Sequence, residues 1–233
     1  MTKHIGIVAC SAEGAALCYR TICTEGANLM GKHAHPEVTM HTFPLSKYMR
    51  YIEAGDWEGV ASLVLSSVAK VAKVGADFAI CPDNTIHQAF DLVVEQSPIP
   101  WLHIVEEVAA EAKRQNYKCL GVLGTRFLIE GSVYPAKLAA MGIEHRIPEV
   151  KDRERINGII FDELVYGCFS PEARLYFNKV IGGLKNQGCD AVVLGCTEIP
   201  LLVTQESSPL PTLDSTRLLA RAALKKATGT ASQ

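Results

Sequence analysis

The stretch GADFAICPDNT, residues 75–85, decides the fold, because its pattern returns as GCDAVVLGCTE at residues 188–198. Each copy begins with glycine, carries an aspartate two residues later, and continues with an apolar run that ends in a polar turn. The alignment places Asp83 of the first copy on Cys196 of the second. Recurring blocks of this kind predict an internal duplication.

A second match supports the duplication. GIVACS at 6–11 aligns with GVLGTR at 121–126. From residue 6 to residue 121 is 115 positions, and from 75 to 188 is 113, so the two matches agree within two residues. Any two βαβ units share some pattern, since Gly-x-Asp before a strand is common. The agreement in spacing nevertheless favours two related α/β lobes in tandem.

Short apolar runs alternate with helical patterns along the whole chain. Two segments show apolar residues at three- and four-residue spacing and end at a glycine, 55–75 and 170–188. The second also begins with Ser170 as a helix N-cap and Pro171 in the first turn. Expected buried strands are 5–10, 76–81, 99–104, 119–125 and 190–196, with 38–43 as a further candidate. This alternation predicts an α/β fold with mostly parallel sheets.

Composition excludes several classes of protein. The chain has 233 residues, a net charge of −2 and no long basic block, so nucleic acid is not an expected partner. No apolar run approaches the ~20 residues of a membrane span, and the first residues lack a signal-peptide layout, so we expect a cytoplasmic protein without a membrane partner. The eight cysteines form no C-x-x-C pair, so we expect no metal site and mostly free thiols.

Polar turns follow the expected strands, where ligands bind in open α/β sheets. These turns are 10–14, 82–85, 124–127 and 195–198. If the lobes face each other, the duplication sets Asp83 and Cys196 on opposite sides of one ligand. Two proton-transfer groups on opposite faces of one carbon are what racemisation requires.

These motifs resemble the cofactor-independent aspartate/glutamate racemase family. The resembling segments are VACSAEGAALCYRTI, EAGDWEG, GVLGTRF, IIFDELVYGCFS and DAVVLGCTEIPLL, in family order. The resemblance implies two pseudo-symmetric Rossmann-like lobes with parallel sheets, the active site in the cleft between them, no cofactor, and commonly a homodimer. We expect one lobe from residues 1–100 with 210–233, and the other from 101–209.

The chain departs from the family in its first catalytic segment. That segment normally reads Cys-Asn-Thr with a histidine two residues later; Asn84, Thr85 and His87 match it, but Asp83 replaces the cysteine. Cys81 would sit roughly 6–7 Å further back along an extended strand, which makes it a poor substitute and favours a structural role.

Three roles for Asp83 stay open. As a base it is ionised at neutral pH, but its ordinary pKa of ~3.9 costs roughly 6 kcal/mol of driving force relative to a cysteine thiolate. Burial or a neighbouring negative charge would raise that pKa and recover part of the loss. As an anchor, Asp83 would bind the substrate ammonium group and leave the proton transfer to Cys196. As a relic, it would mark a protein that binds without turnover.

The remaining candidate residues are expected to bind the substrate or to support the residues that do. The resemblance places Arg50 where many members carry a substrate-binding arginine, and places Tyr166 where many carry a lysine, so it does not imply a strictly acidic substrate. Expected substrate ligands are Ser11, Arg50, Asn84, Thr85, Thr125, Tyr166, Thr197 and Glu198, with His87 as support. Several of these residue types also serve as turn formers or helix caps.

The expected activity is racemisation of a small α-amino acid with Cys196 on one face and Asp83 on the other. A second hypothesis is a lyase that decarboxylates malonate-type acids with Cys196 as its sole proton donor. A third is a non-catalytic binder of amino acids or dicarboxylic acids.

Overall fold

A computed structural model describes residues 2–229, which divide into two compact units. Unit 1 combines the residues up to Ile104 with those from Thr216 on, and unit 2 is Val105–Ser215. The chain passes between the units at the first residues of two helices, α5 (Ile104–Arg114) and α11 (Ser215–Thr228). Within residues 2–229, every helix is too short or too polar to cross a membrane.

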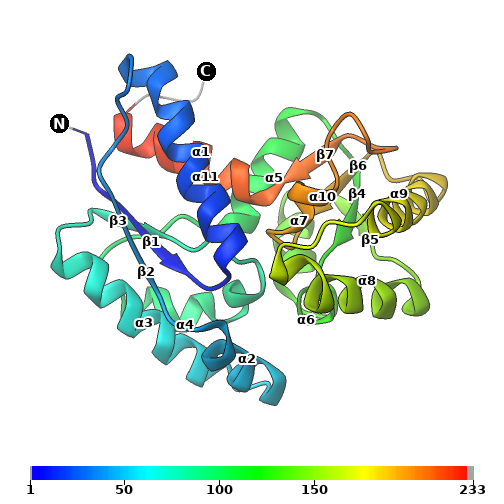
Figure 1. The fold of residues 1–233 in the computed structure, drawn as a ribbon, viewed down its shortest axis with the longest axis horizontal. Coiled ribbons are helices and arrows are strands. Elements are labelled where there is room, and N and C mark those ends of the chain that lie inside the picture. The colour runs from blue at the N-terminus through cyan, green and yellow to red at the C-terminus, as the bar shows by residue number, and fades with distance from the viewer. Residues whose placement is uncertain (1, 230–233) are drawn as a thin grey trace. The chain divides into compact units, whose positions relative to one another are not determined.

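Unit 1 is built on a parallel sheet in the order β2-β1-β3 (Figure 1). Its strands are β1 (Ile5–Ala9), β2 (Val38–Thr42) and β3 (Phe78–Ile80). All five residues of β1 are buried, as expected for a central strand covered on both faces.

The expected strand at 99–104 is wrong. Within this segment, only Trp101 forms a bridge, which pairs it with Ala79 of β3. The Pro100 carbonyl accepts the Ala79 N–H at 2.8 Å and the Leu102 N–H donates to the Ala79 carbonyl at 3.1 Å. Pro98 and Pro100 supply no backbone N–H, so the pairing does not extend into a ladder. The next helix already begins at Ile104.

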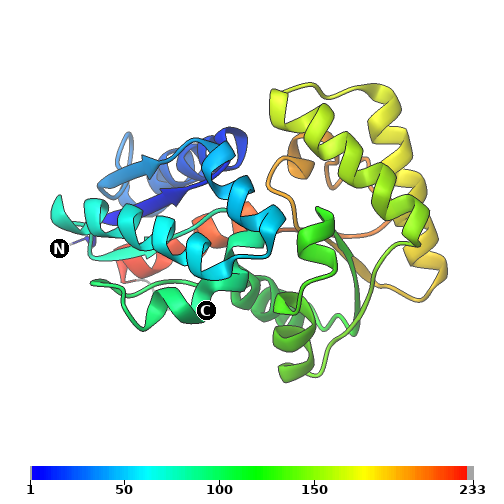
Figure 2. The ribbon, with the colours of Figure 1, turned by 90° about the horizontal axis from the view of Figure 1, so that it is seen from below.

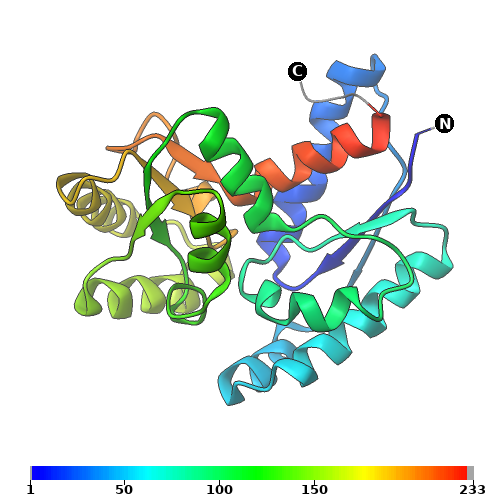
Figure 3. The ribbon, with the colours of Figure 1, turned by 180° about the vertical axis from the view of Figure 1, so that it is seen from behind.

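Helices flank the first sheet. They are α1 (Ala12–Met30), α2 (Leu45–Ala54), α3 (Trp57–Lys73), the 3-10 helix η1 (Thr85–Ala89) and α4 (Phe90–Val94). The predicted helix at 55–75 is confirmed as α3, whose N-cap Asp56 accepts a hydrogen bond from the Gly59 N–H. Helices α1 and α11 lie side by side, joined by the Arg221–Glu25 ion pair (Figures 1 and 3).

Unit 2 is built on a parallel sheet in the order β5-β4-β6-β7. Its strands are β4 (Cys119–Leu123), β5 (Glu144–Arg146), β6 (Ala191–Leu194) and β7 (Thr212–Asp214). Strands β5 and β7 were not predicted from the sequence. Each is three residues long and lies at an edge of the sheet, so neither shows a long apolar run.

The helices of unit 2 are α5, α6 (Arg126–Ile129), α7 (Val133–Ala140), α8 (Val150–Asp162), η2 (Leu164–Tyr166), α9 (Pro171–Asn186) and α10 (Ile199–Leu202). The predicted helix at 170–188 is confirmed as α9, and the Ser170 hydroxyl accepts the Ala173 N–H at 3.1 Å. Helices α8 and α9 run next to each other (Figure 2). Ile160 and Phe177 from these helices join Leu194 of β6 in one buried core.

The predicted duplication is visible in matching hydrogen bonds. In unit 1, Asp77 donates its N–H to the His4 carbonyl and accepts the His4 N–H on its carboxylate. In unit 2, Asp190 makes the same two bonds to Cys119. Each aspartate thus ties the start of one strand to the start of the central strand beside it.

Matching close contacts also recur. A Cβ on Gly6 of β1 would lie 2.8 Å from the side chain of Val71 in α3. A Cβ on Gly121 of β4 would lie 2.8 Å from the side chain of Leu184 in α9. In both units, therefore, a glycine in the central strand lets a helix pack closely on the sheet.

Candidate active site

Both sheets carry polar side chains where their central strands end. In unit 1, Ser11 follows β1 and Asp83 follows β3; in unit 2, Thr125 follows β4 and Cys196 follows β6. Because neighbouring strands are parallel, the two residues of each pair lie at the same carboxyl end of their sheet. Each unit by itself therefore gathers polar turns at the carboxyl end of its sheet, as the sequence predicts.

Asp83 is half-buried and organises the turn after β3. Its Oδ1 accepts the Ile86 N–H at 3.1 Å, which caps the first turn of η1. Asn84 is buried and begins that turn. A carboxylate at position 83 thus has a local structural role in addition to any role toward a ligand.

His87 is buried and fixes the backbone of this turn. Its Nδ1 lies 2.8 Å from the Asp83 carbonyl, and its Nε2 lies 3.3 Å from the Ile104 N–H. A carbonyl only accepts and an N–H only donates, so the ring carries its proton on Nδ1. His87 therefore links the Asp83 turn to the start of α5.

Tyr48 of α2 is a member of this neighbourhood that sequence analysis missed. Its side chain is 1% exposed, and its hydroxyl has no hydrogen-bond partner among the described residues. Burial raises the pKa of Tyr48, and its electrostatic interactions with Cys81, Cys10 and Asp83 raise it further. The hydroxyl thus lies near the ends of β1 and β3. Nothing in the helical pattern of 45–54 distinguishes it from an ordinary core tyrosine.

Cys81 is enclosed next to Asp83. Burial raises the pKa of the Cys81 thiol well above its ordinary value, and the Asp83 charge raises it further. A thiol in this setting stays neutral and packs as an apolar side chain.

The Cys196 side chain contacts the carboxyl group of Glu198. Its Sγ donates a hydrogen bond to Glu198 Oε2 at 2.9 Å, and the Thr197 hydroxyl donates to the same oxygen at 3.2 Å. Cys196 is half-buried, whereas Glu198 is only 2% exposed. Glu198 Oε1 is buried without a hydrogen-bond partner among the described residues. The thiol therefore sits directly beside an enclosed carboxyl group.

Glycines bring this turn close to the end of β4. The Gly195 N–H donates to the Leu123 carbonyl at 2.8 Å. A Cβ on Gly195 would lie 2.6 Å from the Leu123 oxygen and 2.7 Å from the Leu128 side chain. Only glycine fits at position 195 without movement of the backbone, so it sets where Cys196 lies.

Thr125 and Ser215 complete the row of polar side chains at the carboxyl end of the unit 2 sheet. Thr125 is buried and is the N-cap of α6, accepting the Leu128 N–H at 3.4 Å. Ser215, which sequence analysis missed, donates to the Leu194 carbonyl at 2.9 Å. Its position after the short strand β7 gives no motif that would have revealed it.

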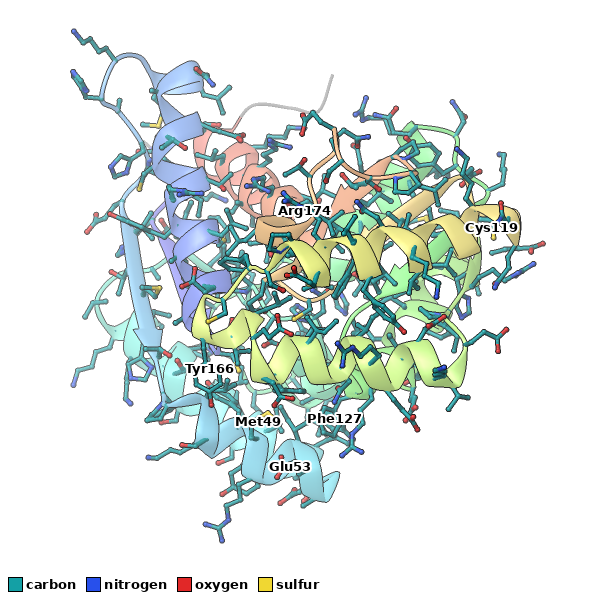
Figure 4. All side chains as sticks on the ribbon, turned by 45° about the vertical axis from the view of Figure 1, so that its right-hand side comes forward. Met49, Glu53, Cys119, Phe127, Tyr166 and Arg174 are labelled. Atoms are coloured by element: carbon teal, nitrogen blue, oxygen red, sulfur yellow. The ribbon has the colours of Figure 1, made fainter. Side chains whose placement is uncertain are left out.

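Arg50 and Tyr166 lie on the surface of their units. Arg50 is exposed on α2, and Tyr166 of η2, labelled in Figure 4, is 77% exposed. Their contact with a substrate stays a prediction, as does the pairing of Asp83 with Cys196 across one ligand. Ser11, Asn84, Thr85, Thr197 and Glu198 are all held in the strand-end turns described above.

The Asp/Glu/Hydantoin racemase family model matches residues 7–223. The chain belongs to this family. A Yersinia pestis structure assigned to the Asp/Glu racemases is 30% identical and superposes with a TM-score of 0.87, covering 97% of this chain and 99% of that one. An aspartate racemase homologue from Pyrococcus horikoshii shares the fold, with 24% identity, a TM-score of 0.83 and the same two coverages.

Among curated proteins, the broad specificity amino-acid racemase RacX of Bacillus subtilis is 25% identical over 169 residues, 71% of each chain. The family match and these relatives make the protein an isomerase of the amino-acid racemase type. They also confirm the two-lobed α/β fold with two parallel sheets.

Proposed function

We propose that this racemase interconverts the enantiomers of a small α-amino acid, with Cys196 on one face of the α-carbon and Asp83 on the other. The observation that carries the proposal is the 2.9 Å hydrogen bond from the Cys196 thiol to Glu198. A thiol that already shares its proton with a carboxylate is prepared both to donate and to accept one.

Glu198 is the proton acceptor next to the Cys196 thiol in this proposal. When Cys196 removes the α-proton, it must first be a thiolate, and Glu198 Oε2 is the acceptor in contact with its Sγ. The ordinary pKa values of cysteine and glutamate differ by about 4 pH units, so the thiol keeps its proton until other groups stabilise the thiolate. When Cys196 acts as the acid, its own proton moves to the substrate carbon.

Asp83 acts as the opposite base in this proposal. Its ordinary pKa makes it a weaker base than a thiolate, at a cost of roughly 6 kcal/mol in driving force. The Ile86 N–H on Oδ1 and the His87 ring on its carbonyl hold the residue in one orientation. An orientation fixed in advance recovers part of that cost, because no ordering is needed at the moment of transfer.

The substrate class follows from the groups present. Ser11, Asn84, Thr85, Thr125 and Thr197 offer hydroxyl and amide groups to an amino acid's carboxylate and ammonium groups. Tyr166, where many family members carry a lysine, offers no charge to a side-chain carboxylate. The similarity to a broad specificity racemase supports a substrate range beyond aspartate and glutamate. We propose that the protein is cytoplasmic, needs no cofactor and acts as a homodimer, which sedimentation would test.

The decisive experiment follows α-deuterium exchange and optical rotation for every proteinogenic amino acid in D₂O. The expected result is exchange with inversion for at least one amino acid, lost in Cys196→Ser and reduced in Asp83→Asn. Exchange without inversion would assign Asp83 as an anchor rather than a base. Absence of exchange with all of them would overturn the proposal, and CO₂ release from substituted malonates would then favour the lyase.

An Asp83→Cys variant separates the remaining alternatives. If Asp83 is a working base, the wild type is active and the variant changes its rate and pH profile. Activity found only in the variant would show that Asp83 marks a lost reaction.

A further inference from the structure

Two cysteines meet at the amino-terminal end of the strands of the unit 2 sheet, opposite the end that Cys196 follows. Cys119 is the first residue of β4, and Cys189 lies just before β6. Their Sγ atoms are 3.8 Å apart, both thiols are reduced, and their side chains are 9% and 4% exposed. Figure 4 shows Cys119 near the carboxyl end of α9.

The backbone around this pair already has the spacing of a disulfide. The Asp190 N–H donates to the Cys119 carbonyl at 2.9 Å, so Cys189 lies one residue before the position opposite Cys119. Adjacent strands lie about 4.8 Å apart and rise about 3.3 Å per residue, so a one-residue offset puts the two Cα atoms roughly 6 Å apart, within the 4.4–6.8 Å that disulfides span. The two sulfurs therefore need only side-chain rotation to move from 3.8 Å to a bond of about 2.05 Å.

Burial and the groups around Cys189 suppress its ionisation. Burial raises the pKa of Cys189, and the neighbouring charge of Cys119 raises it further, while Arg146 of β5 lowers it. We therefore assign Cys189 as the thiol that keeps its proton, and Cys119, the less buried of the two at 9% against 4% exposed, as the one that meets a peroxide. The Arg146 guanidinium, which also pairs with Glu144 at 2.8 Å, is close enough to act on both thiols.

We propose that Cys119 and Cys189 form an oxidisable dithiol, a modification site separate from Cys196, which a peroxide converts to a disulfide. The Cys119 thiolate attacks one peroxide oxygen, the O–O bond breaks, and the departing hydroxide takes a proton to become water. Cys119 is then a sulfenic acid. The Cys189 sulfur attacks the Cys119 sulfur, the S–O bond breaks, and the hydroxide leaves as water with the Cys189 proton. Two thiols lose two electrons, and one peroxide becomes two waters.

The disulfide would join β4 and β6 across 70 positions of the chain, from residue 119 to residue 189. A cross-link over a loop of this length stabilises mainly by restricting the unfolded chain. We expect the midpoint of thermal unfolding to rise by about 5 °C or more. The bond lies at the amino-terminal end of the strands, whereas Cys196 follows their carboxyl-terminal end, so the turn of Cys196 should be unchanged.

The test treats the full chain with hydrogen peroxide at pH 7 and pH 9 and maps its peptides by mass spectrometry without reduction. The expected product is a cross-linked peptide pair containing Cys119 and Cys189, lighter by two hydrogen atoms and restored by dithiothreitol. Its formation should be faster at pH 9, because the thiolate is the reacting form. The midpoint of unfolding should rise as the cross-link accumulates.

Matched variants identify the pair. Cys119→Ser and Cys189→Ser should each lose the cross-link and the rise in the midpoint, while Cys168→Ser, at an exposed cysteine, should retain both. Oxidation of the wild type that yields only sulfinic or sulfonic acids at Cys119 or Cys189, or that leaves both thiols reduced, would overturn the proposal. These outcomes do not depend on racemase activity.

Discussion

At the scale of single residues, the contact between Cys196 and Glu198 is the one whose chemistry is easiest to isolate. Glu198→Gln keeps the shape of the side chain but removes its ability to take a proton from the thiol. We expect kcat/KM to fall by about 100-fold, the lower end of what proton transfer by a side chain contributes. The enantiomers have equal free energy, so the loss must be equal in both directions.

The pH profile distinguishes a proton acceptor from a packing residue. In Glu198→Gln, the rise of activity should move to lower pH than in the wild type, because the negative charge beside the thiol, which disfavours the thiolate, is gone. Glu95→Gln, at an exposed carboxylate, should leave both rate and profile unchanged. An unchanged profile in Glu198→Gln with an equal loss at every pH would show that Glu198 only supports the turn.

Removal of the Tyr48 hydroxyl is expected not to destabilise the protein, unlike the loss of most buried polar groups. Its hydroxyl is enclosed without a hydrogen-bond partner among the described residues, so removing it relieves a desolvation cost. Tyr48→Phe should leave the free energy of unfolding unchanged or raise it by up to about 1 kcal/mol. Tyr134→Phe is the control: that hydroxyl is also buried but bonds Ser215, and its loss should cost about 1 kcal/mol. Equal losses in denaturant titrations of both variants would contradict this account.

At the scale of elements, the turn from β6 to Cys196 depends on Gly195. Gly195→Ala would push a Cβ to 2.6 Å from the Leu123 carbonyl oxygen, and we expect a loss of about 2 kcal/mol or more in stability together with reduced turnover. Gly182→Ala in α9 meets nothing within 4 Å and should stabilise by up to about 1 kcal/mol. Chemical denaturation measures both, and a harmless Gly195→Ala would show that the turn has room to move.

The contact between β2 and α3 should make stability depend on pH. His41 lies 2.7 Å from the Ser67 hydroxyl and 3.0 Å from Lys70 Nζ. Burial lowers the pKa of His41, and Lys70 lowers it further. At low pH the unfolded chain therefore binds a proton at His41 more readily than the folded chain does. The free energy of unfolding consequently falls as the pH drops below the ordinary histidine pKa of ~6.5. His41→Asn should flatten this fall between about pH 6.5 and 5, whereas His33→Asn, at an exposed histidine, should not.

Elements whose sequence pattern is long or repeated can be predicted from the sequence. Helices α3 and α9 carry periodic apolar residues and glycine stops, and the buried strands β1 and β6 are nearly uninterrupted apolar runs. Edge strands of three residues carry no such pattern. The segment 99–104 is apolar, but it pairs with β3 only at one bridge, because Pro100 can accept a backbone hydrogen bond and cannot donate one.

The candidate site divides in the same way. Positions such as Asp83 and Cys196 follow from the rule that polar turns gather at the carboxyl ends of parallel strands. The enclosure of Glu198 and of Tyr48 depends on side-chain packing between distant segments. No local pattern encodes these, so only the folded chain reveals them.

At the scale of the whole molecule, the duplication predicts that equivalent substitutions act alike but in different units. Asp77 and Asp190 each accept a backbone N–H at 2.6 Å from the segment that begins the central strand, His4 in one unit and Lys118 in the other. Replacing either carboxylate with an amide weakens a charge-assisted hydrogen bond, so Asp77→Asn and Asp190→Asn should each cost about 1–2 kcal/mol.

Hydrogen exchange can assign each loss to its unit, because local stability is read amide by amide. Asp77→Asn should speed exchange in β1 and β3 and leave β4 and β6 nearly unchanged, and Asp190→Asn should do the reverse. Ser208→Ala, in the loop before β7, serves as a control with little effect on either sheet. Equal acceleration in both sheets from one substitution would show that the two halves unfold as one cooperative unit, and that the duplication of the fold does not extend to its energetics.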